Sequence, residues 1–124
     1  MASKKTILVI DDTQDILEAV NEILTIEGYS VITAEDEGQM YKILNDEKRL
    51  PDLVLLDVLL SGQDGRVLAQ VLKKNKSTSH IPIIMMSAHP DVEKTIRSAS
   101  GADDFISKPF DIDDLISKIK KYIK

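Results

Sequence analysis

The residues of this sequence that could do chemistry together are three aspartates, a serine and a lysine, each placed directly after a short strand-like run. Asp11 and Asp12 follow the first run, and Asp57 follows a later one. Ser87 and Lys108 follow two further runs. In open parallel sheets, side chains at the carboxyl ends of strands meet at one edge, where ligands bind. We therefore expect these five side chains to converge on a single site.

Three carboxylates held close together repel one another, so a site that keeps them ionised needs a divalent cation. Oxygen ligands without Cys or His favour a hard cation, and Mg²⁺ is the usual choice where phosphate is handled. A lysine and a hydroxyl on the opposite side would complement an anion. The set therefore indicates phosphoryl transfer, in which the cation and the lysine neutralise phosphoryl oxygens and a carboxylate attacks in line.

Each of these residues also has a simpler interpretation. An aspartate after a strand is often only a helix N-cap or a turn residue, and a lone serine can also cap a helix. A lone lysine is usually a solvated surface residue. The adjacent pair Asp11-Asp12 is harder to explain in this way, because neighbouring like charges gain nothing structurally. The joint occurrence of these features, each at its own strand end, favours the functional interpretation.

The elements that must position these residues alternate along the chain. Ile7–Ile10 and Leu53–Leu56 are continuous apolar runs that end at aspartates, as in strands buried on both faces. Apolar residues at helical spacing separate the runs and predict five helices, the fourth beginning near Pro90 and the fifth capped by Asp111. This alternation predicts a five-stranded parallel sheet, doubly wound into three α/β/α layers with right-handed crossovers. The predicted strands are Ile7–Ile10, Ser30–Ala34, Leu53–Leu56, Ile81–Met86 and Asp104–Ser107.

Two of the predicted helices carry specific expectations. Thr13 is expected to act as the N-cap of the first helix, which the Glu27-Gly28 pair ends. The third helix follows a turn-rich stretch. Val67, Leu68, Val71 and Leu72 have helical spacing and predict this helix.

Length and composition exclude several classes of protein. The 124 residues suffice for one domain. The absence of Cys excludes a disulfide scaffold, a Cys-ligated zinc site and a thiol nucleophile. With 16 basic and 21 acidic residues, the net charge of -5 argues against direct binding of nucleic acid. No apolar run approaches the roughly 20 residues of a membrane span, and none near the start suits a signal peptide. We expect a cytoplasmic protein with no membrane partner.

Over nearly its whole length, the sequence resembles the receiver domain of two-component response regulators. The resemblance implies a flavodoxin-like, CheY-like fold, with residues 1–124 as a single receiver domain and no output domain in this chain. It also implies a signalling switch rather than a conventional enzyme. The motifs that carry the resemblance are Leu8–Asp12, Leu53–Asp57, Gly65, Met86–Ala88 and Gly101–Phe110.

The resemblance implies a role for each residue at the end of the first and third strands. Asp57 is the expected phosphoacceptor, which attacks a phosphohistidine on a sensor histidine kinase or a phosphotransfer protein. Asp12 is an expected direct Mg²⁺ ligand, and Asp11 acts largely through bound water. Leu59 would contribute its backbone carbonyl to the metal, so its side chain matters little for that task.

The resemblance also implies how the phosphoryl group is held and sensed. Ser87 would donate a hydrogen bond to a phosphoryl oxygen and Lys108 would pair with the group. Phe105 matches the switch aromatic, which changes rotamer as Ser87 moves. The Lys108–Pro109 peptide bond is expected to be cis. A downstream protein partner would then bind the surface made by the fourth helix, the fifth strand and the fifth helix.

Two positions of this chain, Ser61 and His89, carry their own expectations. Ser61 stands where the family usually has Pro, which predicts a less rigid loop after the phosphoacceptor. His89 could orient an attacking water, although a surface histidine in a turn is the simpler interpretation.

The resemblance also implies that the kinase docks near the first helix, where Leu17 could belong to the docking patch.

Other interpretations stay open at this point. A flavodoxin-type protein would share the sheet, but the loop Asp11–Asp15 would repel a phosphate unless a metal intervened. An aspartyl-phosphate hydrolase would place a second Asp where this chain has Thr13. A receiver fold that has lost phosphorylation would serve only as a binding module. The chain could also be the receiver of a longer regulator.

Overall fold

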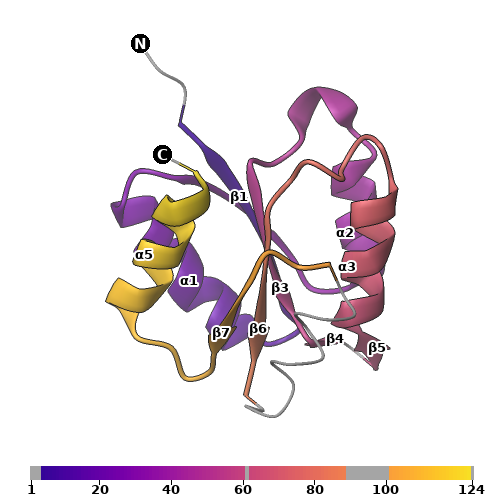
Figure 1. Ribbon diagram of the computed structural model, residues 1–124. Coiled ribbons are helices and arrows are strands. Elements are labelled where there is room, and N and C mark those ends of the chain that lie inside the picture. The colour runs from indigo at the N-terminus through magenta and orange to yellow at the C-terminus, as the bar shows by residue number, and fades with distance from the viewer. Residues whose placement is uncertain (1–3, 61, 89–100, 124) are drawn as a thin grey trace.

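The main sheet has five parallel strands in the order β2-β1-β3-β6-β7, and helices cover both of its faces (Figure 1). This computed structural model describes residues 4–60, 62–88 and 101–123. The strand order and the helices on both faces confirm the predicted doubly wound parallel sheet. Its strands are β1 (Thr6–Ile10), β2 (Ser30–Ala34), β3 (Leu53–Asp57), β6 (Ile83–Ser87) and β7 (Asp104–Ser107).

The three central strands explain why the sequence shows continuous apolar runs. Every residue of β3 and β6 is buried, as is every residue of β1 after Thr6. β6 begins at Ile83, two residues later than predicted, because Pro82 has no N–H to donate to a neighbouring strand. β7 lies at the edge of the sheet, as expected.

Successive residues of each strand face opposite helical layers. Ile7 and Val9 pack in the layer that contains α1 and α5, whereas Leu8 and Ile10 pack in the layer that contains α2 and α3. The predicted fourth helix, near Pro90, lies outside the described residues. The described helices are α1 (Gln14–Ile26), α2 (Glu37–Leu44), α3 (Gly65–Lys74) and α5 (Ile112–Tyr122), with a 3-10 turn η1 (Glu47–Arg49).

The helix starts show which caps the sequence predicted well. Asp111 accepts a hydrogen bond from the Asp113 N–H (2.8 Å), as expected for the cap of α5. Thr13 occupies the N-cap position of α1, but its side chain makes no capping hydrogen bond. Instead, its own N–H donates to Asp11 Oδ1 at 2.9 Å. The first helix therefore begins with a hydrogen bond to a residue of the predicted site.

The predicted third helix is present as α3, and the structure shows which of its apolar residues face the core. Val67 and Val71 of α3 are 54% and 42% exposed, while Leu68 and Leu72 are buried. Both pairs have the same four-residue spacing, so the sequence could not show which pair faces the core. The expectation that Leu17 of α1 belongs to a docking patch is wrong, because its side chain is buried against the sheet.

The turn-rich stretch after Asp57 contains a small antiparallel ladder that the sequence did not predict. β4 (Leu59–Leu60) pairs with β5 (Gln63–Asp64), with Leu59 opposite Asp64. Leu60 is fully buried, and Gly62 adopts a positive φ of 81° in the turn. This ladder ties the residue expected to ligate the metal to the start of α3. Ser61 itself lies outside the described residues.

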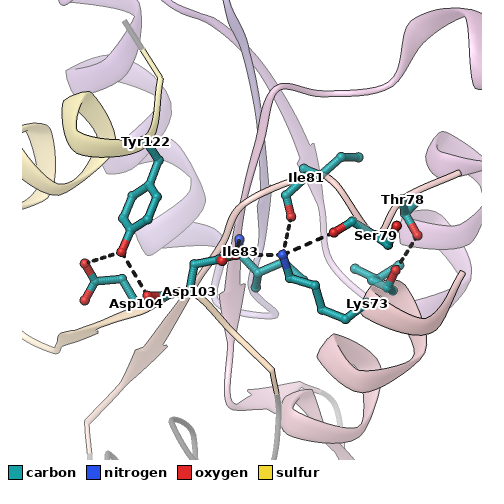
Figure 2. A network of polar contacts seen from close by, with 9 residues as sticks. Lys73, Thr78, Ser79, Ile81, Ile83, Asp103, Asp104 and Tyr122 are labelled. Atoms are coloured by element: carbon teal, nitrogen blue, oxygen red, sulfur yellow. Dashed lines mark hydrogen bonds and ion pairs between the residues drawn. The ribbon is translucent and has the colours of Figure 1, made fainter. Parts of the chain in front are cut away.

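The opposite, amino end of the sheet carries a polar network (Figure 2). Lys73 Nζ of α3 lies 2.7 Å from Asp103 Oδ2, which also accepts the Ile83 N–H at 2.8 Å. The Tyr122 hydroxyl of α5 lies 2.9 Å from the Asp103 carbonyl oxygen and 3.0 Å from Asp104 Oδ2. These bonds join both helical layers to the starts of β6 and β7.

No helix among the described residues is long and apolar enough to cross a membrane.

Candidate functional site

The three predicted acidic residues lie together at the carboxyl end of the sheet. β1 and β3 are neighbours with Ile10 opposite Leu56, so the residues that follow these two stand side by side. One carboxylate oxygen from each of Asp11, Asp12 and Asp57 lies within 4.8 Å of the others. Asp11 is fully buried and Asp57 nearly so, whereas Asp12 is exposed. Three oxygen donors in this arrangement fit a hard divalent cation such as Mg²⁺.

Lys108 reaches the acidic cluster from the end of β7. Its Nζ lies 2.5 Å from Asp11 Oδ2 and 3.4 Å from Asp57 Oδ1. The Lys108 backbone N–H donates to the Ser87 carbonyl at 2.7 Å, which fixes the end of β7 beside the end of β6. The Lys108–Pro109 peptide bond is cis, as expected. A single ammonium group therefore faces two buried carboxylates.

Burial, together with a smaller contribution from the neighbouring Asp11 charge, raises the pKa of the Asp57 carboxyl from an ordinary value of 3.8 to about 6. The Lys108 ammonium and the Leu59 N–H, which donates to Asp57, act in the opposite direction but do not cancel the effect. The protein without a cation therefore carries unfavourable charge at this site. A bound divalent cation would stabilise the ionised form.

A pocket of about 260 Å³ opens over these residues. Ser87 is buried in its wall, and Leu59 is 61% exposed. Phe105 does not line the pocket; its side chain is buried in the layer of α2 and α3. The predicted convergence of side chains is therefore present, and the roles given to them remain predictions. The lining residues are Asp12, Asp57, Leu59, Ser87, Ala88 and Lys108.

Two residues beside the site had little or no signal in the sequence. Ala88 belongs to the Met86–Ala88 motif, but alanine offers no chemistry to give it a role; it lines the pocket because it follows Ser87. Gly65 was visible as part of a motif, but its closeness to Asp57 depends on the packing of α3 against β3. His89, which could have oriented a water, lies outside the described residues.

The fold and the acidic pocket agree with a comparison against known protein families. A family model for the response regulator receiver domain matches residues 7–120. The chain therefore belongs to the response regulator receiver family, a family of signalling switches. This membership favours a receiver over the flavodoxin and hydrolase interpretations.

Relatives with known names agree with this assignment. The phosphate regulon transcriptional regulatory protein PhoB of Pseudomonas aeruginosa is 39% identical over 121 residues, covering 97% of this chain and 52% of the relative. RpaA of Synechocystis, named a DNA-binding dual master transcriptional regulator, is 33% identical, covering 95% of this chain and 48% of the relative. The chain thus spans about half the length of these relatives. They give no support to the expectation that nucleic acid is not contacted directly.

The solved structures agree as well. A CheY-like response regulator receiver domain protein from Methanospirillum hungatei superposes with a TM-score of 0.85 at 32% identity. The match covers 96% of this chain and 93% of that one. The predicted CheY-like fold is therefore confirmed.

Proposed function

We propose that this chain is a phosphorylation-dependent switch of a two-component system, in which Asp57 accepts a phosphoryl group from a sensor histidine kinase or a phosphotransfer protein. The observation that carries the proposal is the position of Asp57. Asp57 is the last residue of a buried strand, lines a pocket, and lies beside two further aspartates and Lys108. A cytoplasmic location is consistent with such a partner.

In the proposed transfer, an Asp57 carboxylate oxygen forms a bond to phosphorus while the bond to the partner's histidine nitrogen breaks. The histidine ring leaves with the electron pair of that bond. The carboxylates of Asp11, Asp12 and Asp57 and the Leu59 backbone carbonyl would hold Mg²⁺. The bound ion would supply positive charge next to the phosphoryl oxygens. The chain would catalyse only its own phosphorylation and dephosphorylation.

Lys108 and Ser87 would bind the phosphoryl group once it is on Asp57. Phosphorylation adds about -1.5 to -2 charges, so Lys108 would turn from Asp11 toward a stronger anion. Ser87 ends β6 and is hydrogen-bonded through its carbonyl to the Lys108 N–H, so a shift of Ser87 would reach β7 directly. Phe105 lies on β7, opposite Met85 of β6. A downstream protein that prefers this shifted arrangement would bind better to the phosphorylated form.

Intact-mass spectrometry after incubation with acetyl phosphate and Mg²⁺ tests the proposal. We expect one added phosphate in the wild type, and none without Mg²⁺ or in Asp57→Asn. Fast hydrolysis could hide the adduct, so the same samples are also titrated with beryllofluoride, a stable phosphoryl mimic, and followed by NMR. A wild type that responds to neither reagent would indicate a receiver fold that serves only as a binding module.

A further inference from the structure

Gly65, the first residue of α3, lies against the backbone of the proposed phosphoacceptor. A Cβ atom at this position would lie 2.1 Å from the Asp57 carbonyl oxygen and 3.1 Å from Val58 Cα. The Gly65 N–H donates to the Val58 carbonyl at 2.6 Å, so the two segments are also hydrogen-bonded. Only a hydrogen atom fits between them. The start of α3 therefore packs directly on the end of β3.

Conformational freedom does not explain this glycine. Gly28, Gly62 and Gly101 have positive φ, the left-handed region that favours glycine, whereas Gly65 does not. Alanine could therefore adopt the backbone conformation of Gly65. What the position requires is the absence of a side chain beside Asp57.

Neither side of this contact can yield easily. The Asp57 carbonyl shares a peptide plane with the Val58 N–H, which donates to the Met86 carbonyl at 2.9 Å. Rotation of that plane would break the bond between β3 and β6 next to Ser87. On the other side, α3 is held by the buried side chains of Leu68 and Leu72. A methyl group at residue 65 would therefore displace the end of β3.

The displaced segment is the one that carries the proposed chemistry. Asp57 supplies the carboxylate, and Leu59 is tied to Asp64, the residue before Gly65, through the β4-β5 ladder. We infer that Gly65 is a positioning residue, which sets the end of β3 so that Asp57 and the Leu59 carbonyl face Asp11, Asp12 and Lys108. This inference rests on the proposed function, because its effect is expected in cation binding and phosphorylation.

Gly65→Ala tests the inference beside two control variants. Gly38→Ala makes the same chemical change in α2, where a Cβ would meet only Asp36 Oδ1 at 3.4 Å. Leu72→Ala weakens the packing of α3 without placing an atom near Asp57. Mg²⁺ affinity is measured by calorimetric titration well below each unfolding temperature, together with the rate of phosphorylation by acetyl phosphate.

We expect Gly65→Ala to weaken Mg²⁺ binding by about tenfold or more and to slow phosphorylation, because the ligands lose their arrangement. Both controls should bind Mg²⁺ with nearly wild-type affinity, although Leu72→Ala is destabilised. Wild-type affinity in Gly65→Ala, or an equal loss in Leu72→Ala, would overturn the inference. If Gly65→Ala does not fold alone, the titration is repeated in trimethylamine N-oxide. Failure to fold there as well would make Gly65 a requirement of the fold and overturn the positioning role.

A metal-free measurement separates this inference from the proposed function. The carbonyl NMR resonances of Asp57 and Leu59 should shift in Gly65→Ala and stay in place in Gly38→Ala, whether or not Mg²⁺ binds. If the wild type binds no Mg²⁺, the proposed function fails while these resonances still decide whether Gly65 sets the strand end. Unchanged resonances in Gly65→Ala would overturn the inference.

Discussion

Asp57 and Asp104 are two aspartates that are each 7% exposed, yet they lie at opposite ends of the sheet and their pKa values shift in opposite directions. Burial and, to a smaller extent, the Asp11 charge together raise the pKa of Asp57 to about 6. Burial also raises the pKa of Asp104, but this effect is outweighed by hydrogen bonds from the Phe105 N–H and the Tyr122 hydroxyl and by two nearby lysines, all of which lower the pKa. The pKa of Asp104 therefore lies below its ordinary value.

The difference arises from the number of partners at each end. At the amino end, Asp104 has Lys118 at 3.5 Å and Lys121 at 3.8 Å, besides the two hydrogen bonds. At the carboxyl end, Lys108 is the only lysine among the described residues that lies near both Asp11 and Asp57, and each of these carboxylates accepts one backbone N–H besides. The amino end therefore resembles a structural network, whereas the carboxyl end keeps an excess of buried negative charge, as expected if it binds a cation or a phosphoryl group in the proposed function.

Loss of the only lysine among the described residues that contacts both buried carboxylates should have the largest effect on stability. In Lys108→Met, Asp11 and Asp57 keep their burial but lose their counter-charge. We expect the free energy of unfolding of the metal-free protein at pH 7 to fall by about 3 kcal/mol. Urea denaturation followed by circular dichroism measures the change, and added Mg²⁺ should recover part of it.

Lys120→Met is the matched control for this variant. Its Nζ lies 3.9 Å from Glu27 Oε2 and its side chain is 61% exposed, so the cost should be below about 1 kcal/mol. An equal loss of unfolding free energy in the two variants would show that Lys108 contributes no more to stability than an exposed lysine does.

Asp57→Asn should stabilise the metal-free protein, in contrast to most substitutions of buried polar residues. A rise of pKa from 3.8 to about 6 corresponds to roughly 3 kcal/mol. Because the pocket opens to solvent, screening reduces the expected gain at pH 7 to about 1–2 kcal/mol. The folded state holds this proton more tightly than the unfolded chain does, so wild-type stability falls as the pH rises from about 4 to about 6.

Urea denaturation of the wild type and of Asp57→Asn across this pH range checks the sign. The advantage of the variant should be absent at the acid end and complete above about pH 6. Saturating Mg²⁺ should stabilise the wild type more than the variant and so reduce the difference. An advantage that is independent of pH would mean that Asp57 is not the source of the unfavourable charge.

The sequence predicted features that depend on neighbouring residues better than features that depend on contacts between distant segments. β1 and β3 were predicted closely, because burial on both faces requires uninterrupted apolar runs such as Ile7–Ile10. The acidic cluster followed, since Asp11, Asp12 and Asp57 each end such a run. The amino-end network was not predicted, because Lys73 and Asp103 meet only through the packing of α3 against β6 and β7.

Shorter and more ambiguous patterns explain the other features that the sequence did not predict. The β4-β5 ladder has two residues in each strand, too few for a period of two to appear. On α3, the spacing of Val67 and Val71 is the same as that of Leu68 and Leu72, and only packing decided between the two pairs. The closeness of Gly65 to Asp57 is likewise a property of packing rather than of local sequence.

Asp104→Asn should have the smallest of these effects and the opposite sign to Asp57→Asn. The variant keeps the shape of the side chain but loses the charge that faces Lys118 and Lys121, so we expect the free energy of unfolding at pH 7 to fall by about 1 kcal/mol. Because the pKa of Asp104 is lowered in the folded state, its contribution is present above the ordinary pKa and is lost as the pH falls through the folded value. Urea denaturation at pH 7 and under acid conditions should therefore show a loss of unfolding free energy, relative to the wild type, that shrinks on acidification.

Since Asp104 lies at the amino end of the sheet, Mg²⁺ affinity in this variant should equal that of the wild type. A loss of Mg²⁺ affinity would show that the two ends of the sheet are energetically coupled, and the contrast between a structural end and a reactive end would no longer hold.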